Sequence, residues 1–133
     1  MAYGEKYLPV NLFGGVFILQ VFFSQEGPVL IARIKGEVDL STAERLRQEL
    51  EASLDHARAH LLYLDLEGVS FMDSSGLGVI LGRYRRLSQK GGKVVICRPQ
   101  PQVRRLLDLS GLSKIIDIVG EEPEEYLQKG GRG

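Results

Sequence analysis

Residues 69–82 of this chain read Val-Ser-Phe-Met-Asp-Ser-Ser-Gly-Leu-Gly-Val-Ile-Leu-Gly. The stretch joins the end of an apolar run, a small polar corner (Asp73, Ser74, Ser75 and Gly76), and the start of a helical pattern. At a helix N-terminus the first four amides lack intrahelical partners, and the dipole adds about half a positive charge. Small hydroxyl and carboxylate residues are favoured there, and so are anions such as phosphate. The stretch therefore predicts a compact polar loop at a helix start, which the active site of a partner can reach.

The simplest interpretation of the corner is that one of its residues is the helix N-cap. Ser74 as a catalytic nucleophile would need a nearby base and an oxyanion site. The histidines, His56 and His60, fall near the end of an earlier predicted helix, and the sequence lacks the Gly-x-Ser-x-Gly elbow around the serine. We therefore expect no catalytic residue and no enzymatic activity.

The glycines that follow the corner resemble a dinucleotide-binding fingerprint, but one residue too many precedes the third, Gly82. Gly78 and Gly82 are four residues apart and would share one face of a helix. A smooth face for close packing or docking is the favoured interpretation. The sequence shows no metal-ligand cluster either, so we expect neither a cofactor nor a metal.

Strands and helices alternate on both sides of this stretch. Apolar runs predict strands at 16–24, 29–34, 61–66, 93–97 and 115–118. Helical spacing predicts a helix that begins with a capping box of Ser41 and Glu44, one from Leu77, one opened by two prolines, and one ending near Gln128. This order predicts an α/β fold with a mixed, mostly parallel sheet of about five strands packed with about four helices. We expect a loosely ordered arm at 1–15, one domain at 16–128 and a flexible tail at 129–133.

The composition of the chain argues against several classes of function. The 17 basic and 17 acidic residues cancel, which argues against non-specific binding to nucleic acid. The single Cys97 cannot form an internal disulfide and lies in an apolar run, as expected in a reducing compartment. No stretch is long and apolar enough for a membrane span, and the N-terminus does not resemble a signal peptide. We expect a cytoplasmic protein.

Residues 71–84, Phe-Met-Asp-Ser-Ser-Gly-Leu-Gly-Val-Ile-Leu-Gly-Arg-Tyr, closely resemble the signature of the bacterial anti-sigma factor antagonists, which are STAS-domain proteins. The similarity extends to Gly-Glu-Val-Asp at 36–39, to Gly-Gly at 91–92 and to residues 107–116, and it covers roughly 29–118. It is strongest to the sporulation members, whose partner kinase holds the first forespore sigma factor. The general-stress members are the near alternative.

The resemblance implies a partner-switching mechanism in transcription regulation. The unphosphorylated protein binds an anti-sigma factor that is also a serine kinase, and the sigma factor is released. The kinase uses ATP to phosphorylate Ser74, which abolishes binding, and a serine phosphatase resets the protein. The implied partner-binding residues are Asp39, Asp73, Ser74, Ser75, Gly76, Leu77 and Gly78.

The physics of the corner agrees with such a switch. A phosphate adds about −1.5 to −2 charges at neutral pH, and beside Asp73 it would cost repulsion and desolvation in a close-fitting interface. The helix N-terminus tolerates the same phosphate, so the fold survives while the interface fails.

Two features leave alternatives open. The arm and the apolar strand near residues 16–23 exceed the family pattern, which suggests an additional edge strand, a dimer contact, or a STAS module that serves as a scaffold or nucleotide sensor in a stress-signalling complex. Basic residues concentrate in two of the predicted helices, where we interpret them as solvated faces, with kinase docking as the alternative; they are Arg83, Arg85, Arg86, Lys90, Arg104 and Arg105.

Overall fold

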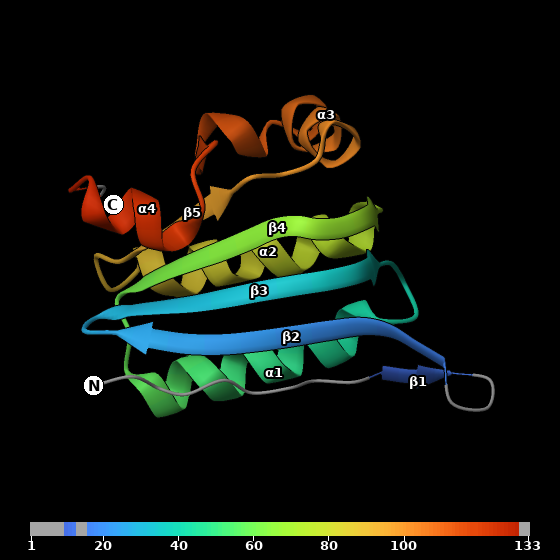
Figure 1. Cartoon of the computed structure of the whole chain (residues 1–133), viewed down its shortest axis with the longest axis horizontal. Helices are drawn as coiled ribbons and strands as arrows, with labels where there is room; N and C mark the ends of the chain where they lie inside the picture. The colour runs from blue at the N-terminus through green and yellow to red at the C-terminus, as the bar shows by residue number, and fades with distance from the viewer. Residues whose placement is uncertain (1–9, 13–15, 131–133) are drawn as a thin grey trace.

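One six-stranded sheet, in the order β1-β2-β3-β4-β5-β6, forms the centre of the molecule (Figure 1). The structure is a computed structural model and describes residues 10–12 and 16–130. The strands are β1 (Val10–Leu12), β2 (Val16–Glu26), β3 (Val29–Val38), β4 (Leu61–Met72), β5 (Lys93–Cys97) and β6 (Asp117–Val119). The first two pairings are antiparallel and the other three are parallel, which confirms the predicted mixed, mostly parallel sheet.

Short β1 adds to the five strands predicted, within a stretch for which the sequence predicted no element. The rest of the predicted arm (1–9 and 13–15) and the end of the predicted tail (131–133) lie outside the described residues. The last predicted strand begins two residues later than expected. The apolar pair Ile115 and Ile116 instead follows a 3-10 helix, η1 (Leu112–Lys114).

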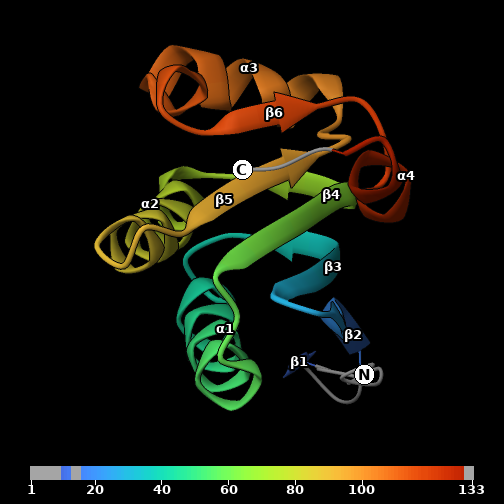
Figure 2. The same ribbon diagram turned by 90° about the vertical axis from the view of Figure 1, so that its left-hand side faces the viewer.

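Helices cover both faces of the sheet (Figure 2). The helices are α1 (Ala43–Ala57), α2 (Ser74–Ser88), α3 (Pro101–Ser110) and α4 (Pro123–Gln128). Helices α1 and α2 lie against one face, and α4 lies against the other. Alternate residues of β2 point to the α1–α2 face, as the two-residue period of a strand requires; Leu19, Val21 and Phe23 are fully buried there. They meet a helical stripe of Leu46, Leu50 and Leu54.

Strand β4 is twice as long as the predicted strand at 61–66, because it continues through Glu67 and Gly68 to Met72. Between the pairs Arg33–Asp65 and Val38–Met72, β3 advances five residues and β4 advances seven. The two extra residues of β4 are accommodated as bulges. Gly68 lies at the first, where a Cβ atom would sit 2.7 Å from Cγ of Lys35.

The predicted capping box at the start of α1 is wrong. The N-cap residue is Thr42, and its side chain makes no capping bond to the helix. Ser41 donates its hydroxyl to Asp39 Oδ1, and Glu44 accepts from Arg47 instead of reaching back. Ser41 thus helps to build the turn before the helix, whereas Glu44 pairs within the helix.

The interpretation of the basic residues as solvated faces is wrong for two members of α2. The side chain of Arg83 is only 9% exposed, and its Nε lies 2.8 Å from Glu51 Oε2 of α1. Burial lowers the pKa of Arg83 from its ordinary value. Arg86 bonds Glu51 at 2.7 Å and Asp55 at 2.5 Å. These ion pairs join α1 to α2, a role that helical periodicity alone does not reveal.

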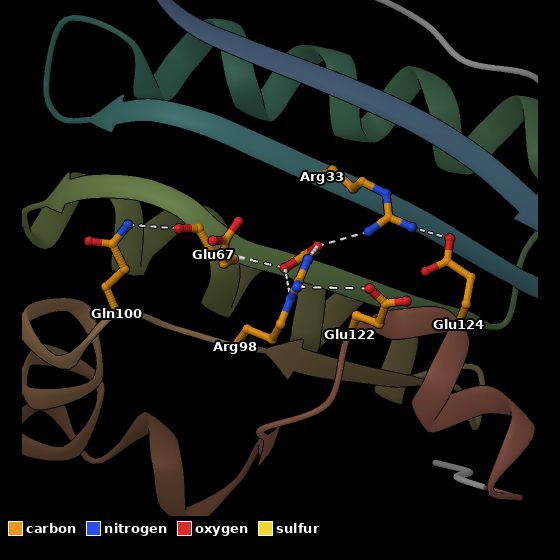
Figure 3. Close-up of polar contacts among 7 residues, drawn as sticks. Arg33, Glu67, Arg98, Gln100, Glu122 and Glu124 are labelled. Carbon is orange, nitrogen blue, oxygen red and sulfur yellow. Dashed lines mark hydrogen bonds and ion pairs between the residues drawn. The ribbon is translucent and has the colours of Figure 1, made fainter.

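On the opposite face, a buried carboxylate connects the sheet to α4 (Figure 3). Asp65 of β4 has a side chain only 4% exposed, and it accepts from Arg33 at 2.9 Å and from Arg98 at 2.7 Å. The same two arginines pair with Glu124 and Glu122 at the start of α4. Removing the Asp65 charge would leave both guanidinium groups without their shared partner.

We predict that Asp65→Asn lowers the free energy of unfolding by about 2 to 3 kcal/mol, somewhat less than for a fully buried pair because both arginines are partly exposed. Asp117→Asn is the matched control, since its ion pair with Lys93 spans 3.0 Å between side chains 50% and 44% exposed. That control should cost about 1 kcal/mol or less. Urea denaturation measures both, and equal effects of the two variants would contradict the structural role of Asp65.

Burial raises the pKa of the Cys97 thiol to about 12. The thiolate is the reactive form, and Cys97 lies in an apolar cluster covered by Tyr126 and Leu127 of α4. We predict that a thiol-specific reagent labels the native protein very slowly at pH 8 and labels it completely once it is denatured. Rapid labelling under native conditions would show that α4 does not stay in place.

Candidate functional site

The carboxyl ends of β3 and β4 bring two polar segments together, at the right-hand end of these strands in Figure 1. Val38 pairs with Met72 in parallel register, so the residues that follow each strand emerge side by side. The amide of Asp73 donates to the carbonyl of Val38 at 3.1 Å. The turn after β3 and the corner after β4 therefore form one continuous surface at the N-terminal ends of α1 and α2.

Asp73, and not either serine, is the N-cap of α2. Its extended backbone (φ −114°, ψ −170°) and its side chain, which accepts from the Ser75 amide at 2.8 Å, satisfy the cap requirement. Ser74 is the first residue of the helix and is exposed. Its hydroxyl makes no hydrogen bond to any residue that the structure describes. The Ser74 hydroxyl is therefore free for another molecule to use.

The turn after β3 is held by its own side chains. Asp39 Oδ1 accepts from the Ser41 amide at 2.9 Å and from the Ser41 hydroxyl at 2.7 Å. These bonds, the hydroxyl bond above all, lower the pKa of Asp39 from its ordinary value. Thr42 is fully buried; its hydroxyl accepts from the Asp39 amide and donates to the Glu37 carbonyl. Asp39 is thus an ionised, fixed group at physiological pH.

The three glycines of α2 differ in how much space surrounds them for a side chain. A Cβ atom on Gly76 would lie 2.6 Å from Cγ of Met72 and 3.0 Å from a methyl of Val38, so internal packing explains this glycine. A Cβ atom on Gly78 or Gly82 would meet nothing within 4 Å. Close packing within the chain therefore does not require these two glycines, which leaves docking as the interpretation of their smooth face.

A hollow of about 290 Å³ separates the start of α1 from the start of α2. Its lining combines residues of the turn, of α1 and of α2: Leu40, Ala43, Glu44, Arg47, Ser75, Gly78 and Val79. A second hollow, of about 260 Å³, lies at the other ends of the same helices, around Arg58 and Lys90. The second hollow contains none of the predicted site residues.

The predicted site residues thus lie together at one end of the sheet, from Asp39 to Gly78. Leu77 is half-buried and packs against the main core, and Gly76 is buried, whereas Ser74 and Gly78 are exposed. Leu40 was missed by the sequence reasoning, although it is 82% exposed. The only sign of it in the sequence is a large apolar residue between two turn-forming residues, Asp39 and Ser41.

Neither histidine of the chain lies at this surface. His56 lies in the last turn of α1, and His60 lines the second hollow, at the opposite end of α2 from Ser74. Among residues 10–12 and 16–130, no cluster of histidine, cysteine or acidic side chains is arranged to hold a metal ion. The helices within these same ranges include none with the length and apolar character that a membrane span requires.

Comparison with known proteins agrees with the geometry. Residues 23–125 match the family profile of the STAS domain. The chain is 43% identical over 104 residues to an anti-sigma F factor antagonist of Paenibacillus polymyxa, covering 78% of this chain and 89% of that protein. It is 36% identical over 85 residues to an anti-sigma-B factor antagonist of Bacillus subtilis, covering 64% of this chain and 76% of that protein.

A solved structure agrees as well. The Bacillus cell-fate determinant SpoIIAA in its phosphorylated form superposes with a TM-score of 0.66 at 26% identity, covering 83% of this chain and 98% of that chain. The residues matched by the family profile include all twelve residues of β4, the corner that follows it and the turn after β3. On these similarities, the chain belongs to the STAS domain family.

Proposed function

We propose that this protein is an anti-sigma factor antagonist whose binding is switched off by phosphorylation of Ser74. The observation that supports this most directly is the division of roles at the start of α2. Asp73 caps the helix, which leaves the Ser74 hydroxyl exposed and unbonded among the described residues. Relatives named as antagonists of anti-sigma F and anti-sigma-B factors supply the class of partner.

In this proposal the unphosphorylated surface docks on an anti-sigma factor that is also a serine kinase, and the sigma factor is released. The kinase transfers a phosphoryl group from ATP to Ser74 Oγ, which loses its proton as the new P–O bond forms and ADP leaves. A serine phosphatase later hydrolyses the phosphoserine. The chain itself contributes no catalytic group and binds no cofactor; it positions the acceptor hydroxyl.

Electrostatics explain why phosphorylation would end the complex without unfolding the protein. The phosphate would stand beside two fixed carboxylates, Asp73 and, across the strand ends, Asp39. Its charge of about −1.5 to −2 must be stripped of water if the surface is to stay in contact with a partner. In the free protein the phosphate stays hydrated at a helix N-terminus, where negative charge is tolerated.

We predict that Ser74→Asp weakens binding to purified anti-sigma F factor of Paenibacillus polymyxa at least ten-fold by calorimetry, because it adds charge at the contact. Its thermal unfolding midpoint should match the unmodified protein, because position 74 is exposed. With ATP present, mass spectrometry should find one phosphate on the native chain and none on Ser74→Ala.

Ser75→Ala is the matched control, since the capping bond to position 75 uses only the backbone amide. This control should still be phosphorylated once. If the phosphate disappears in Ser75→Ala but persists in Ser74→Ala, the modified residue is Ser75, and the role proposed for Ser74 is wrong. Failure of the native chain to bind at all would count against the proposed function.

Gly78→Ala should separate stability from binding. Outside its own stretch of helix, the new methyl group would have no atom of the described residues within 4 Å. Alanine is favoured over glycine in a helix by about 1 kcal/mol, so the variant should unfold at a higher temperature. It should nevertheless bind the anti-sigma factor more weakly, because the methyl group protrudes from the docking face. Gly76→Ala should instead destabilise the fold. Its free energy of unfolding should fall by about 1 to 3 kcal/mol, because the new methyl group is overpacked against Met72. Unimpaired binding by Gly78→Ala would remove this part of α2 from the interface.

A further inference from the structure

The turn after β3 holds a large apolar side chain out into solvent. Leu40 is 82% exposed, although its neighbour Thr42 is fully buried. Single exposed leucines are common on protein surfaces and need no explanation by themselves. Leu40 differs because it forms one wall of the hollow whose opposite wall includes Ser75 and Gly78 of α2.

The position of Leu40 is fixed before any partner arrives. The bonds from Ser41 to the Asp39 carboxylate close the turn on one side, and the buried Thr42 hydroxyl ties it to the Glu37 carbonyl on the other. The amides of Thr42 and Ala43 both donate to the Asp39 carbonyl, at 3.1 and 2.8 Å. Because the backbone of the turn is already held in place, binding through Leu40 costs no ordering of a loop, which favours its use as an interface anchor.

The hollow beside Leu40 is suited to an apolar side chain with a polar rim. Ala43 and Val79 line it together with Leu40, and the missing side chain of Gly78 keeps it open. On its outer side the Glu44 and Arg47 side chains neutralise each other through hydrogen bonds of 2.9 and 2.7 Å. A side chain that binds in the hollow therefore needs no charge of its own to pair with Glu44 or Arg47.

We propose that this hollow receives an apolar side chain of the anti-sigma factor, and that Leu40 is an anchor of that contact. The inference rests on the proposed function and names the apolar contact within the same surface. The surface is continuous with the switch, because Ser75 lines the hollow and Ser74 precedes it. A phosphate on Ser74 would place a hydrated charge at the edge of an apolar contact, which adds to the cost of docking.

The test measures binding of purified anti-sigma F factor of Paenibacillus polymyxa to three variants by calorimetry. Leu40→Ala should raise Kd about ten-fold or more, since it removes most of the apolar surface that the contact buries. Leu40→Met, which conserves apolar volume, should stay within about three-fold of the native Kd. Arg45→Ala serves as the control, because Arg45 is an exposed neighbour on α1 that does not line the hollow, and it should bind as the native chain does.

A second readout uses phosphorylation. Leu40→Ala leaves Ser74 and its cap intact, so the kinase reaction should show a raised KM for this variant with kcat unchanged. All variants should unfold at the native temperature, since Leu40 is exposed. If Leu40→Ala binds with the native Kd while Ser74→Asp still abolishes binding, Leu40 is not an anchor. The proposed function would not be affected by that result. Loss of binding by Leu40→Met and Arg45→Ala as well would also overturn the role given to Leu40.

Discussion

The parallel pairing of β3 with β4 up to their carboxyl ends is the constraint on which the candidate site depends. The turn after β3 and the corner after β4 lie far apart in sequence, and each is too short to form a surface alone. The bond from the Asp73 amide to the Val38 carbonyl joins them directly. Because both strands are buried in the middle of the sheet, thermal motion of either segment is restricted by the core. The site is a rigid surface and not a flexible loop.

A rigid surface suits a switch that works by charge. The two acidic residues of this surface, Asp39 and Asp73, are each engaged by hydrogen bonds from their own segment. Neither can move away from a new negative charge without losing those bonds. Phosphorylation in the proposed mechanism therefore changes what the surface can contact and leaves the fold unchanged. Such a switch needs no second conformation of the protein.

The fold could be predicted from the sequence wherever one periodicity dominated a segment. The apolar run of β2, rich in β-forming residues, predicts a strand, and the three- and four-residue spacing of Ala43, Leu46, Leu50 and Leu54 predicts a helix. Prediction failed where a residue bonds a partner outside the pattern from which it was predicted. Arg83 fits a solvated helix face by spacing, yet Glu51 of another helix draws it into a buried ion pair. Ser41 and Glu44 fit a capping box, but Asp39 competes for the serine and Arg47 for the glutamate.

The place of the polar corner at a helix start could be predicted from the sequence, but the whole lining of the hollow beside it could not. A run of Asp-Ser-Ser-Gly before a helical pattern identifies a helix start, and Ser74 does lie there. The sequence could not decide which residue caps the helix, because aspartate and serine have similar capping preferences. Leu40 was missed because its exposure depends on how β3 and β4 end together, which no local pattern encodes.

The bulges of β4 have a consequence for how this chain can vary. Successive side chains of a strand point to opposite faces, so each extra residue reverses which face the following residues occupy. Two extra residues reverse the side-chain direction twice, so that it is unchanged beyond the second bulge. Met72 therefore points into the same core as Leu66. Deleting one residue from this part of β4 would turn Met72 outward and displace Asp73 from its place beside Val38. Insertions and deletions should therefore accumulate in the turns at the far end of the sheet, whereas the length of β4 is held constant.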